Sequence, residues 1–140
     1  MFKKAVFPGK YIQGVGAVSE LPVLVKLLGK RGLILASPST ADKTLPQCGL
    51  NLSDSPLDVE RFHGECCEEE VVRILDVIAK RHADVLIGMG GGKTIDTAKI
   101  AADRANIPAI IVPTIASTDA PCSGCAVLYS KDGVYERVFY

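Results

Sequence analysis

Residues 84–99, with the sequence DVLIGMGGGKTIDTAK, decide the fold because a short apolar run passes through a group of glycines into a helical pattern. Residues 84–88 are typical of a strand that is buried on both faces. We predict a helix from about Thr94 to Arg104. Its inward face would carry apolar residues at helical spacing, namely Ile95, Ala98, Ile100, Ala101 and Ala105.

The same alternation of strand and helix continues on both sides of this stretch. Upstream, we predict a short strand at 11–13, a helix at 18–30 with Pro22 in its first turn, a strand at 32–36 and a strand at 57–62. Residues 66–82 give the clearest helix, with three glutamates in its first turn. Prolines interrupt residues 37–56, so a helix near 40–45 must be short. Downstream, we predict a strand at 108–112, and residues 126–129 and 134–140 flank Lys131-Asp132-Gly133, which indicates a hairpin.

These elements predict one α/β domain over residues 1–140. Apolar strands that alternate with helices indicate a mostly parallel, Rossmann-like sheet with helices on both faces, followed here by a C-terminal β-hairpin. Ligands of such sheets bind outside the carboxyl ends of the strands. We therefore expect the functional residues in the loops that leave those ends.

Composition excludes several classes of protein. Sixteen basic residues balance sixteen acidic ones, so no net charge attracts a nucleic acid or a membrane surface. The apolar N-terminal run is interrupted by Pro8 and Lys10, which makes it too short for a signal peptide. The five cysteines are odd in number and sparse, so we expect reduced thiols and a cytoplasmic protein.

The loop with glycines at 88 and 90–92, which we name the glycine loop, has the composition of a phosphate-binding loop. Glycines let the backbone approach a phosphate closely, and the helix that follows directs free amide hydrogens at it. The loop is not a Walker A motif, because position 87 would be glycine and is Ile87. It is not the usual Rossmann motif either, because Lys93 stands where the third glycine belongs. The alternative is a tight strand-to-helix turn that binds nothing.

A second loop follows the strand at 108–112. Residues 113–123 contain five hydroxyl or carboxylate side chains within ten residues: Thr114, Ser117, Thr118, Asp119 and Ser123. Such groups suit recognition of ribose and polyol hydroxyls. They also suit a solvated turn or a helix cap, and the residues alone leave both interpretations open.

GGGKTIDTAK at 90–99, together with PTIASTDAPCS at 113–123, resembles the glycerol-oxidising branch of the iron-containing alcohol dehydrogenase family. PGKYIQG at 8–14 and GEC at 64–66 resemble the same branch. The resemblance implies a dehydroquinate synthase-like N-terminal domain. It also implies oxidation of glycerol, or a similar small polyol, to dihydroxyacetone by hydride transfer to NAD, with zinc polarising the alcohol oxygen.

The resemblance also implies roles for individual residues. Those that match the pyrophosphate-binding segment are Gly90, Gly91, Gly92, Lys93, Thr94, Ile95 and Asp96. Thr114 and Ser117 match contacts to the adenosine and nicotinamide side of NAD, and Asp119 matches a residue at the substrate hydroxyls. Ser123, Cys125 and Tyr129 match further cofactor contacts, although Cys125 replaces a usual aliphatic residue.

One departure from the family concerns cofactor choice. The family usually has an aspartate that binds the adenine ribose diol at the end of its second strand. Ser37 stands at that position here, followed by Pro38. Without the carboxylate, we expect weaker selection of NAD and tolerance of the 2′-phosphate of NADP.

The other departure concerns the metal. In the family, an aspartate and two histidines hold it, and they belong to a helical domain that we expect beyond residue 140. His63 and His82 lack the spacing of a metal pair, and Cys122 and Cys125 have no second pair to complete a zinc site. We therefore expect this chain alone to be inactive and the full-length protein to be a homo-oligomer. The alternative is a free-standing nucleotide-binding module, or a truncated product, without turnover.

Overall fold

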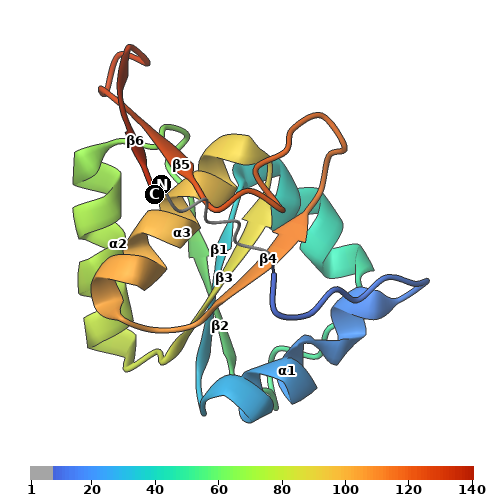
Figure 1. Cartoon of the computed structure of the whole chain (residues 1–140). Helices are drawn as coiled ribbons and strands as arrows, with labels where there is room; N and C mark the ends of the chain where they lie inside the picture. Colours follow the sequence, from blue (N-terminus) through green and yellow to red (C-terminus); the bar gives the residue numbers. More distant parts are fainter. Residues whose placement is uncertain (1–7) are drawn as a thin grey trace, which may run out of the picture.

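A parallel four-stranded sheet forms the centre of the computed structural model, which describes residues 8–140 (Figure 1). Its strands are β1 (Gly32–Ala36), β2 (Leu57–Arg61), β3 (Val85–Gly90) and β4 (Ala109–Pro113), in the order β2-β1-β3-β4. β1 lies between β2 and β3, and its Gly32 pairs with Leu57 on one side and Val85 on the other. The carboxyl ends of all four strands therefore lie at one edge of the sheet.

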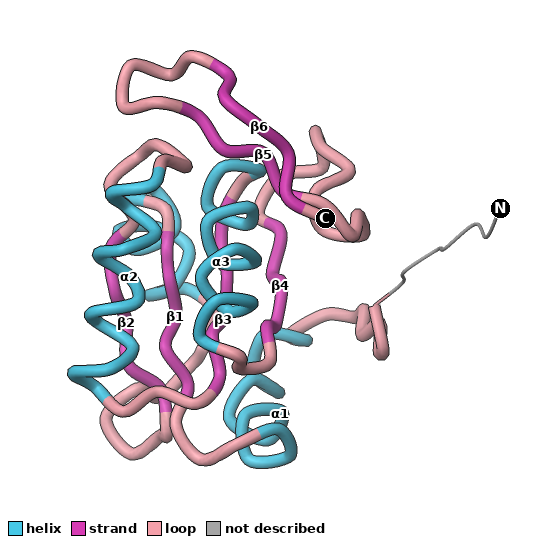
Figure 2. Tube along the Cα trace, turned by 60° about the vertical axis from the view of Figure 1, so that its left-hand side comes forward, coloured by secondary structure: helices cyan, strands magenta, loops and turns pink. Residues whose placement is uncertain are grey.

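Helices cover both faces of this sheet. α2 (Glu68–Arg81) and α3 (Gly92–Ala105) lie side by side on one face (Figure 2). α1 (Leu21–Leu28), with the short helices η2 (Thr40–Thr44) and η3 (Leu45–Gln47), covers the other face. Side chains of β1 alternate between the two cores: Leu33 and Leu35 pack with α2 and α3, whereas Ile34 packs with α1.

The chain ends in a two-stranded antiparallel hairpin, β5 (Ala126–Tyr129) and β6 (Tyr135–Phe139). It lies over α3 rather than joining the main sheet (Figure 2). The Tyr129 amide donates a hydrogen bond of 2.8 Å to the carbonyl of Cys66, just before α2. The predicted parallel sheet, its helices on both faces and the C-terminal hairpin are all confirmed.

Two predictions for the N-terminal part were wrong. Residues 11–13 form no strand, because no neighbouring strand pairs with them, and Tyr11 and Ile12 are exposed. The helix at 18–30 is shorter than predicted and begins with the 3₁₀ turn η1 (Ala17–Glu20). The α-helical part starts at Leu21, directly before Pro22, because proline has no amide hydrogen for a helical bond and is tolerated only in the first turn.

The turn between β3 and α3 is tighter than predicted. β3 continues to Gly90 and α3 begins at Gly92, so Gly91 alone separates them. A Cβ atom on Gly88 would lie 2.6 Å from the Cβ of Ala98, and one on Gly90 would lie 2.8 Å from Oγ1 of Thr94. These two glycines are therefore required for the close packing of α3 on β3.

Candidate functional site

The carboxyl ends of the central strands surround a hollow of about 470 Å³, which we name the strand-end pocket. The residues that line it come from the loops after β1, β2, β3 and β4: Ser37, Pro38, Ser39, Phe62, Gly64, Gly91, Gly92, Lys93, Thr94, Thr114 and Ile115. The Ser37 hydroxyl is hydrogen-bonded to the Thr40 hydroxyl at 2.7 Å, which holds it at the end of β1. The pocket lies where the topology of an α/β sheet places a ligand.

The first turn of α3 presents unpaired amide groups to this pocket. The Ile95 amide makes the first helical hydrogen bond, 3.0 Å to the carbonyl of Gly91. The amides of Gly92, Lys93 and Thr94 have no partner within residues 8–140, and no side chain caps the helix. Free N–H donors at the positive end of a helix dipole favour an anion such as a phosphate group.

A second, smaller hollow of about 220 Å³ lies between α3 and the hairpin, and we name it the hairpin pocket. Its lining residues are Gly92, Lys93, Asp96, Thr118, Asp119, Ala120, Ser123, Cys125, Val127 and Tyr129. Gly92 and Lys93 line both pockets, so the two hollows meet at the first turn of α3. The start of α3 is therefore shared by the two pockets.

Lys93 supplies the positive charge at this meeting point. Its ammonium group lies 2.6 Å from Oε2 of Glu65 and 5.2 Å from the centre of the Tyr129 ring. Glu65 is itself held in place, because its Oε1 accepts a hydrogen bond of 3.0 Å from the Cys66 amide. An incoming phosphate would have to share Lys93 with this carboxylate.

Two charged side chains of α3 bind the backbone of the hairpin segment. Oδ2 of Asp96 accepts a hydrogen bond of 3.1 Å from the Val127 amide, and the Lys99 ammonium donates to the carbonyls of Ser123 and Cys125. Burial raises the pKa of Asp96 and lowers the pKa of Lys99. The two charged groups are thus largely removed from water, and they hydrogen-bond to the backbone of the hairpin segment.

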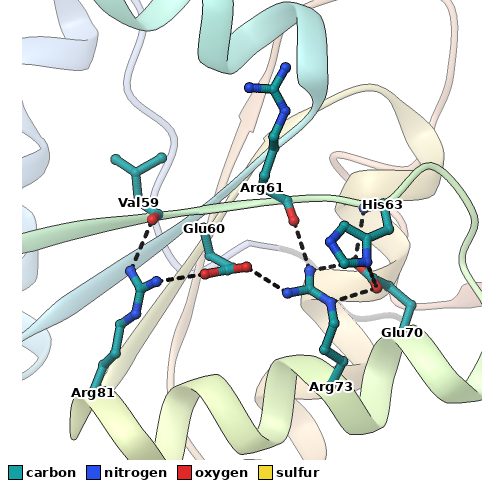
Figure 3. Close-up of polar contacts among 7 residues, drawn as sticks. All are labelled: Val59, Glu60, Arg61, His63, Glu70, Arg73 and Arg81. Carbon is teal, nitrogen blue, oxygen red and sulfur yellow. Dashed lines mark hydrogen bonds and ion pairs between the residues drawn. The ribbon is translucent and has the colours of Figure 1, made fainter.

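An ion-pair network fixes the loop that follows β2 (Figure 3). Arg73 of α2 contacts the carboxylate of Glu70 at 2.8 Å and that of Glu60 at 2.5 Å, and it also donates to the carbonyl of Arg61. Arg81 holds the other oxygen of Glu60 at 2.7 Å. The Glu70 carboxylate in turn accepts a hydrogen bond of 3.0 Å from the His63 amide. The network therefore ties β2 and its loop, which carries Phe62 and Gly64 into the strand-end pocket, to α2.

Most of the residues predicted for the site gather at these two pockets. Ser37, Gly91, Gly92, Lys93, Thr94 and Thr114 line the strand-end pocket, and Asp96, Asp119, Ser123, Cys125 and Tyr129 line the hairpin pocket. Three predicted residues line neither. Gly90 is the last residue of β3, Ile95 is fully buried in the core, and Ser117 is exposed outside both pockets.

Sequence reasoning missed other residues of the site. The strand-end pocket also contains Pro38, Ser39, Phe62 and Ile115, and Thr118 lies over Gly92 in the hairpin pocket. Thr118 was among the hydroxyl side chains noted in the loop at 113–123, although the resemblance gave it no role of its own. No local pattern predicted the contact of Glu65 with Lys93, because 28 positions separate them in the sequence.

The histidines and cysteines of the described chain do not form a metal site. Within residues 8–140, no group of three or more histidine, cysteine, aspartate or glutamate side chains could hold a metal ion. His63 contacts Glu70, and His82 ends α2 in a left-handed conformation. All five cysteines are free thiols. In the same part of the chain, no helix is both long and apolar enough to cross a membrane.

Comparison with known proteins shows similarity along the whole described chain. The sequence profile of a family described as "Iron-containing alcohol dehydrogenase" matches residues 8–140. A glycerol dehydrogenase of Thermotoga maritima is 38% identical over 142 residues, which cover 100% of this chain and 38% of the enzyme. The crystal structure of a probable glycerol dehydrogenase from Sinorhizobium meliloti 1021 superposes with a TM-score of 0.86 at 42% identity, covering 99% of this chain and 38% of that one.

A more distant structure shares the fold. It is a sulfoacetaldehyde reductase from Bifidobacterium kashiwanohense in complex with NAD⁺, with a TM-score of 0.78 at 22% identity over 96% of this chain and 42% of that one. The chain thus spans about two fifths of the length of the relatives and structures it matches.

Proposed function

The chain belongs to the iron-containing alcohol dehydrogenase family, and on this premise we propose that it forms the cofactor-binding half of an NAD-dependent oxidoreductase of glycerol or a similar small polyol. The polyol is suggested by the relatives, which are named glycerol dehydrogenase. The cofactor is suggested by the shape and chemistry of the two pockets.

The observation that carries the proposal is the row of free amides at the start of α3. The free amides of Gly92 and Lys93 belong to residues that line both pockets, and that of Thr94 belongs to a residue of the strand-end pocket. A dinucleotide has two nucleoside ends joined by a pyrophosphate. In our proposal the pyrophosphate occupies these amides, and each end extends into one pocket.

The two ends are assigned by the residues around them. We place the adenosine in the strand-end pocket, which Ser37 and Thr114 line, with Ser37 beside its ribose. We place the nicotinamide ribose and ring in the hairpin pocket, against Ser123 and Tyr129. This orientation puts the reactive ring next to Asp119, the residue that the resemblance places at the substrate.

NAD, when bound, supplies the acceptor for the hydride that leaves the alcohol carbon. The proposed task of the chain is to hold the ring and the polyol in contact. Asp119, an exposed carboxylate in the wall of the hairpin pocket, would accept hydrogen bonds from polyol hydroxyl groups and so orient the substrate. The described residues do not fit a metal ion, so we assign any metal to the part of the relatives that this chain does not match.

Cofactor binding is tested by titrating this chain with NADH and following the nucleotide's fluorescence. We expect saturable binding that ADP-ribose displaces, because ADP-ribose retains the adenosine and the pyrophosphate. The replacement Thr94→Pro, which removes one of the three free amides without adding charge, should weaken binding of both ligands. Absence of NADH binding at millimolar concentration would refute the cofactor assignment.

Substrate recognition is tested with the complete gene product. We expect Asp119→Asn to lower kcat/KM for glycerol while the Kd for NADH stays nearly unchanged. The change Asp54→Asn, which removes the same charge at an exposed residue that lines neither pocket, is the matched control. Equal losses of glycerol turnover and NADH affinity in Asp119→Asn would show that Asp119 belongs to the cofactor site instead.

A further inference from the structure

We propose that Asp96 and Lys99 are positioning residues that hold the nicotinamide-side wall of the hairpin pocket in place through hydrogen bonds to its backbone. The proposal rests on the function given above, because that function assigns this pocket to the nicotinamide end of NAD. It also replaces the expectation that Asp96 helps to bind the pyrophosphate, which a carboxylate would repel.

The wall concerned consists of residues 123–129, which are the end of the loop before β5 and β5 itself. Ser123, Cys125, Val127 and Tyr129 all line the hairpin pocket. Val127 and Tyr129 are alternate residues of the strand and therefore point to the same side, and Ser123 and Cys125 lie directly before it. A movement of this one segment would therefore displace four pocket-lining side chains together.

Lys99 binds two carbonyls of this segment and one of its hydroxyls. Its ammonium group donates to the Ser123 carbonyl at 2.8 Å, the Ser123 hydroxyl at 3.1 Å and the Cys125 carbonyl at 3.0 Å. An ammonium group has three hydrogens, so all of them are used. The Lys99 side chain is 17% exposed, which leaves it largely removed from water.

Asp96 binds the same segment further along. Its Oδ2 accepts a hydrogen bond of 3.1 Å from the Val127 amide. Asp96 and Lys99 are one helical turn apart on α3, so together they hold the wall at two points along its length.

The two charges are not arranged mainly for each other. The Lys99 nitrogen lies 3.9 Å from Oδ1 of Asp96, beyond hydrogen-bond distance, and this buried oxygen has no hydrogen-bond partner among residues 8–140. A buried ion pair kept for stability would close this gap, because an unpaired buried acceptor costs free energy. Both groups instead direct their hydrogen bonds at the wall, which is the arrangement expected of residues that fix its position.

The test compares a ligand that enters the hairpin pocket with one that does not. NADH carries the nicotinamide ribose and ring, and ADP lacks both but retains the pyrophosphate and adenosine. In this 140-residue chain, we expect Lys99→Met and Asp96→Ala to weaken NADH binding about tenfold and ADP binding less than about twofold. Hydrogen exchange should become faster at residues 123–129 in both variants.

Conservative variants and matched controls make the test specific. Asp96→Asn keeps an acceptor for the Val127 amide and should restore most of the NADH affinity that Asp96→Ala loses. Asp103→Asn on α3 and Lys80→Met on α2 change the same charges at exposed positions and should leave both affinities unchanged. If Lys99→Met does not fold, Lys99→Gln, which retains two donors, replaces it in the same comparison.

Each outcome decides the proposal. Equal losses for NADH and ADP would overturn it, as would unchanged NADH affinity or unchanged hydrogen exchange in the two disruptive variants. Tighter binding of both ligands by Asp96→Asn would instead indicate that the carboxylate lies against the pyrophosphate. If the unaltered chain bound neither ligand, the proposed function would fail, and hydrogen exchange would still show whether the two residues hold the wall.

Discussion

The ammonium group of Lys93 lies 2.6 Å from Oε2 of Glu65, which joins the start of α3 to the loop before α2. Among the described residues, Lys93 is the one cationic side chain that lines the two pockets, and this carboxylate already occupies it. A phosphate that binds the first turn of α3 must therefore compete with Glu65 for Lys93.

The replacement Glu65→Gln should tighten binding of ADP-ribose about two- to fivefold, because it removes the competing charge from a partly exposed ion pair. The glutamine keeps an oxygen for the Cys66 amide, so the loop should remain in place. Calorimetric titration measures the change, and Glu136→Gln, exposed on β6, is the control. Weaker binding in Glu65→Gln would mean that Glu65 itself contacts the ligand.

Two glycines of the same stretch should differ in what they support. Gly88→Ala should lower the free energy of unfolding by about 1–3 kcal/mol, because the new methyl group would lie 2.6 Å from the Cβ of Ala98. Gly91→Ala has room, with Ile115 at 3.6 Å, and should keep its stability while weakening ADP-ribose binding. Urea unfolding and calorimetric titration separate the two effects. Similar losses of stability in both variants would contradict this division.

Ser37 should set the choice between NAD and NADP. We expect the chain to bind NADH and NADPH with affinities within about tenfold of each other, because no carboxylate repels the 2′-phosphate at the end of β1. Ser37→Asp should increase the preference for NADH. Ser39→Asp, at a neighbouring residue of the same pocket, tests whether position matters beyond charge. An unchanged ratio in Ser37→Asp would place the adenine ribose elsewhere.

Acid should weaken the ion-pair network through Glu70. Although burial opposes its ionisation, hydrogen bonds from Arg73 and the His63 amide hold the pKa of Glu70 below its ordinary value of 4.5. A lowered folded-state pKa stabilises the protein above about pH 4.5, and this contribution is lost as the pH falls through the folded-state value. Glu70→Gln should therefore be less stable at pH 7 by about 1–3 kcal/mol and approach the parent chain in acid.

Urea unfolding between pH 7 and pH 3 measures this convergence. Asp76→Asn, on the exposed side of α2, is the control and should change stability by less than about 0.5 kcal/mol at pH 7. A stability difference for Glu70→Gln that stayed constant down to pH 3 would rule out the ionised carboxylate as its source.

The cysteines should differ widely in reactivity. Burial raises the pKa of the Cys66 thiol to about 12, whereas Cys122 is exposed. At pH 8 a disulfide reagent should modify Cys122 first and Cys66 at least about a hundredfold more slowly, because the thiolate is the reactive form. Mass spectrometry of the labelled peptides identifies the sites, and denaturant should abolish the difference. Rapid labelling of Cys66 in the folded chain would contradict its burial.

The sequence predicted the elements that have a periodic signal of their own. Burial is indicated directly by the apolar run at 32–36 and by the helical spacing of Val71, Ile74 and Ile78. These side chains are buried in the structure. The strand predicted at 11–13 failed because a strand exists only beside a partner, and three residues carry no information about a partner. Local patterns therefore identify elements better than they identify pairings.

The candidate site shows the same limit. The glycine loop and the loop at 113–123 were predictable because each is contiguous in the sequence and follows a strand. Ile95 belongs to the segment that the resemblance marks, but its side chain lies in the core, because a helix turns every third or fourth side chain towards the core. The contacts of Lys99 with residues 123–125 depend on how the hairpin lies over α3, which no local pattern encodes.

The hairpin is joined to the starts of two helices, through the Cys66 carbonyl before α2 and through Asp96 on α3. These tertiary bonds can form only once both helices have docked on the sheet. Because β5 and β6 follow both helices and the main sheet in the chain, they are synthesised after the elements that they pack against. The hairpin pocket thus gains one of its walls last, and a nascent chain that has already formed its sheet still lacks this pocket.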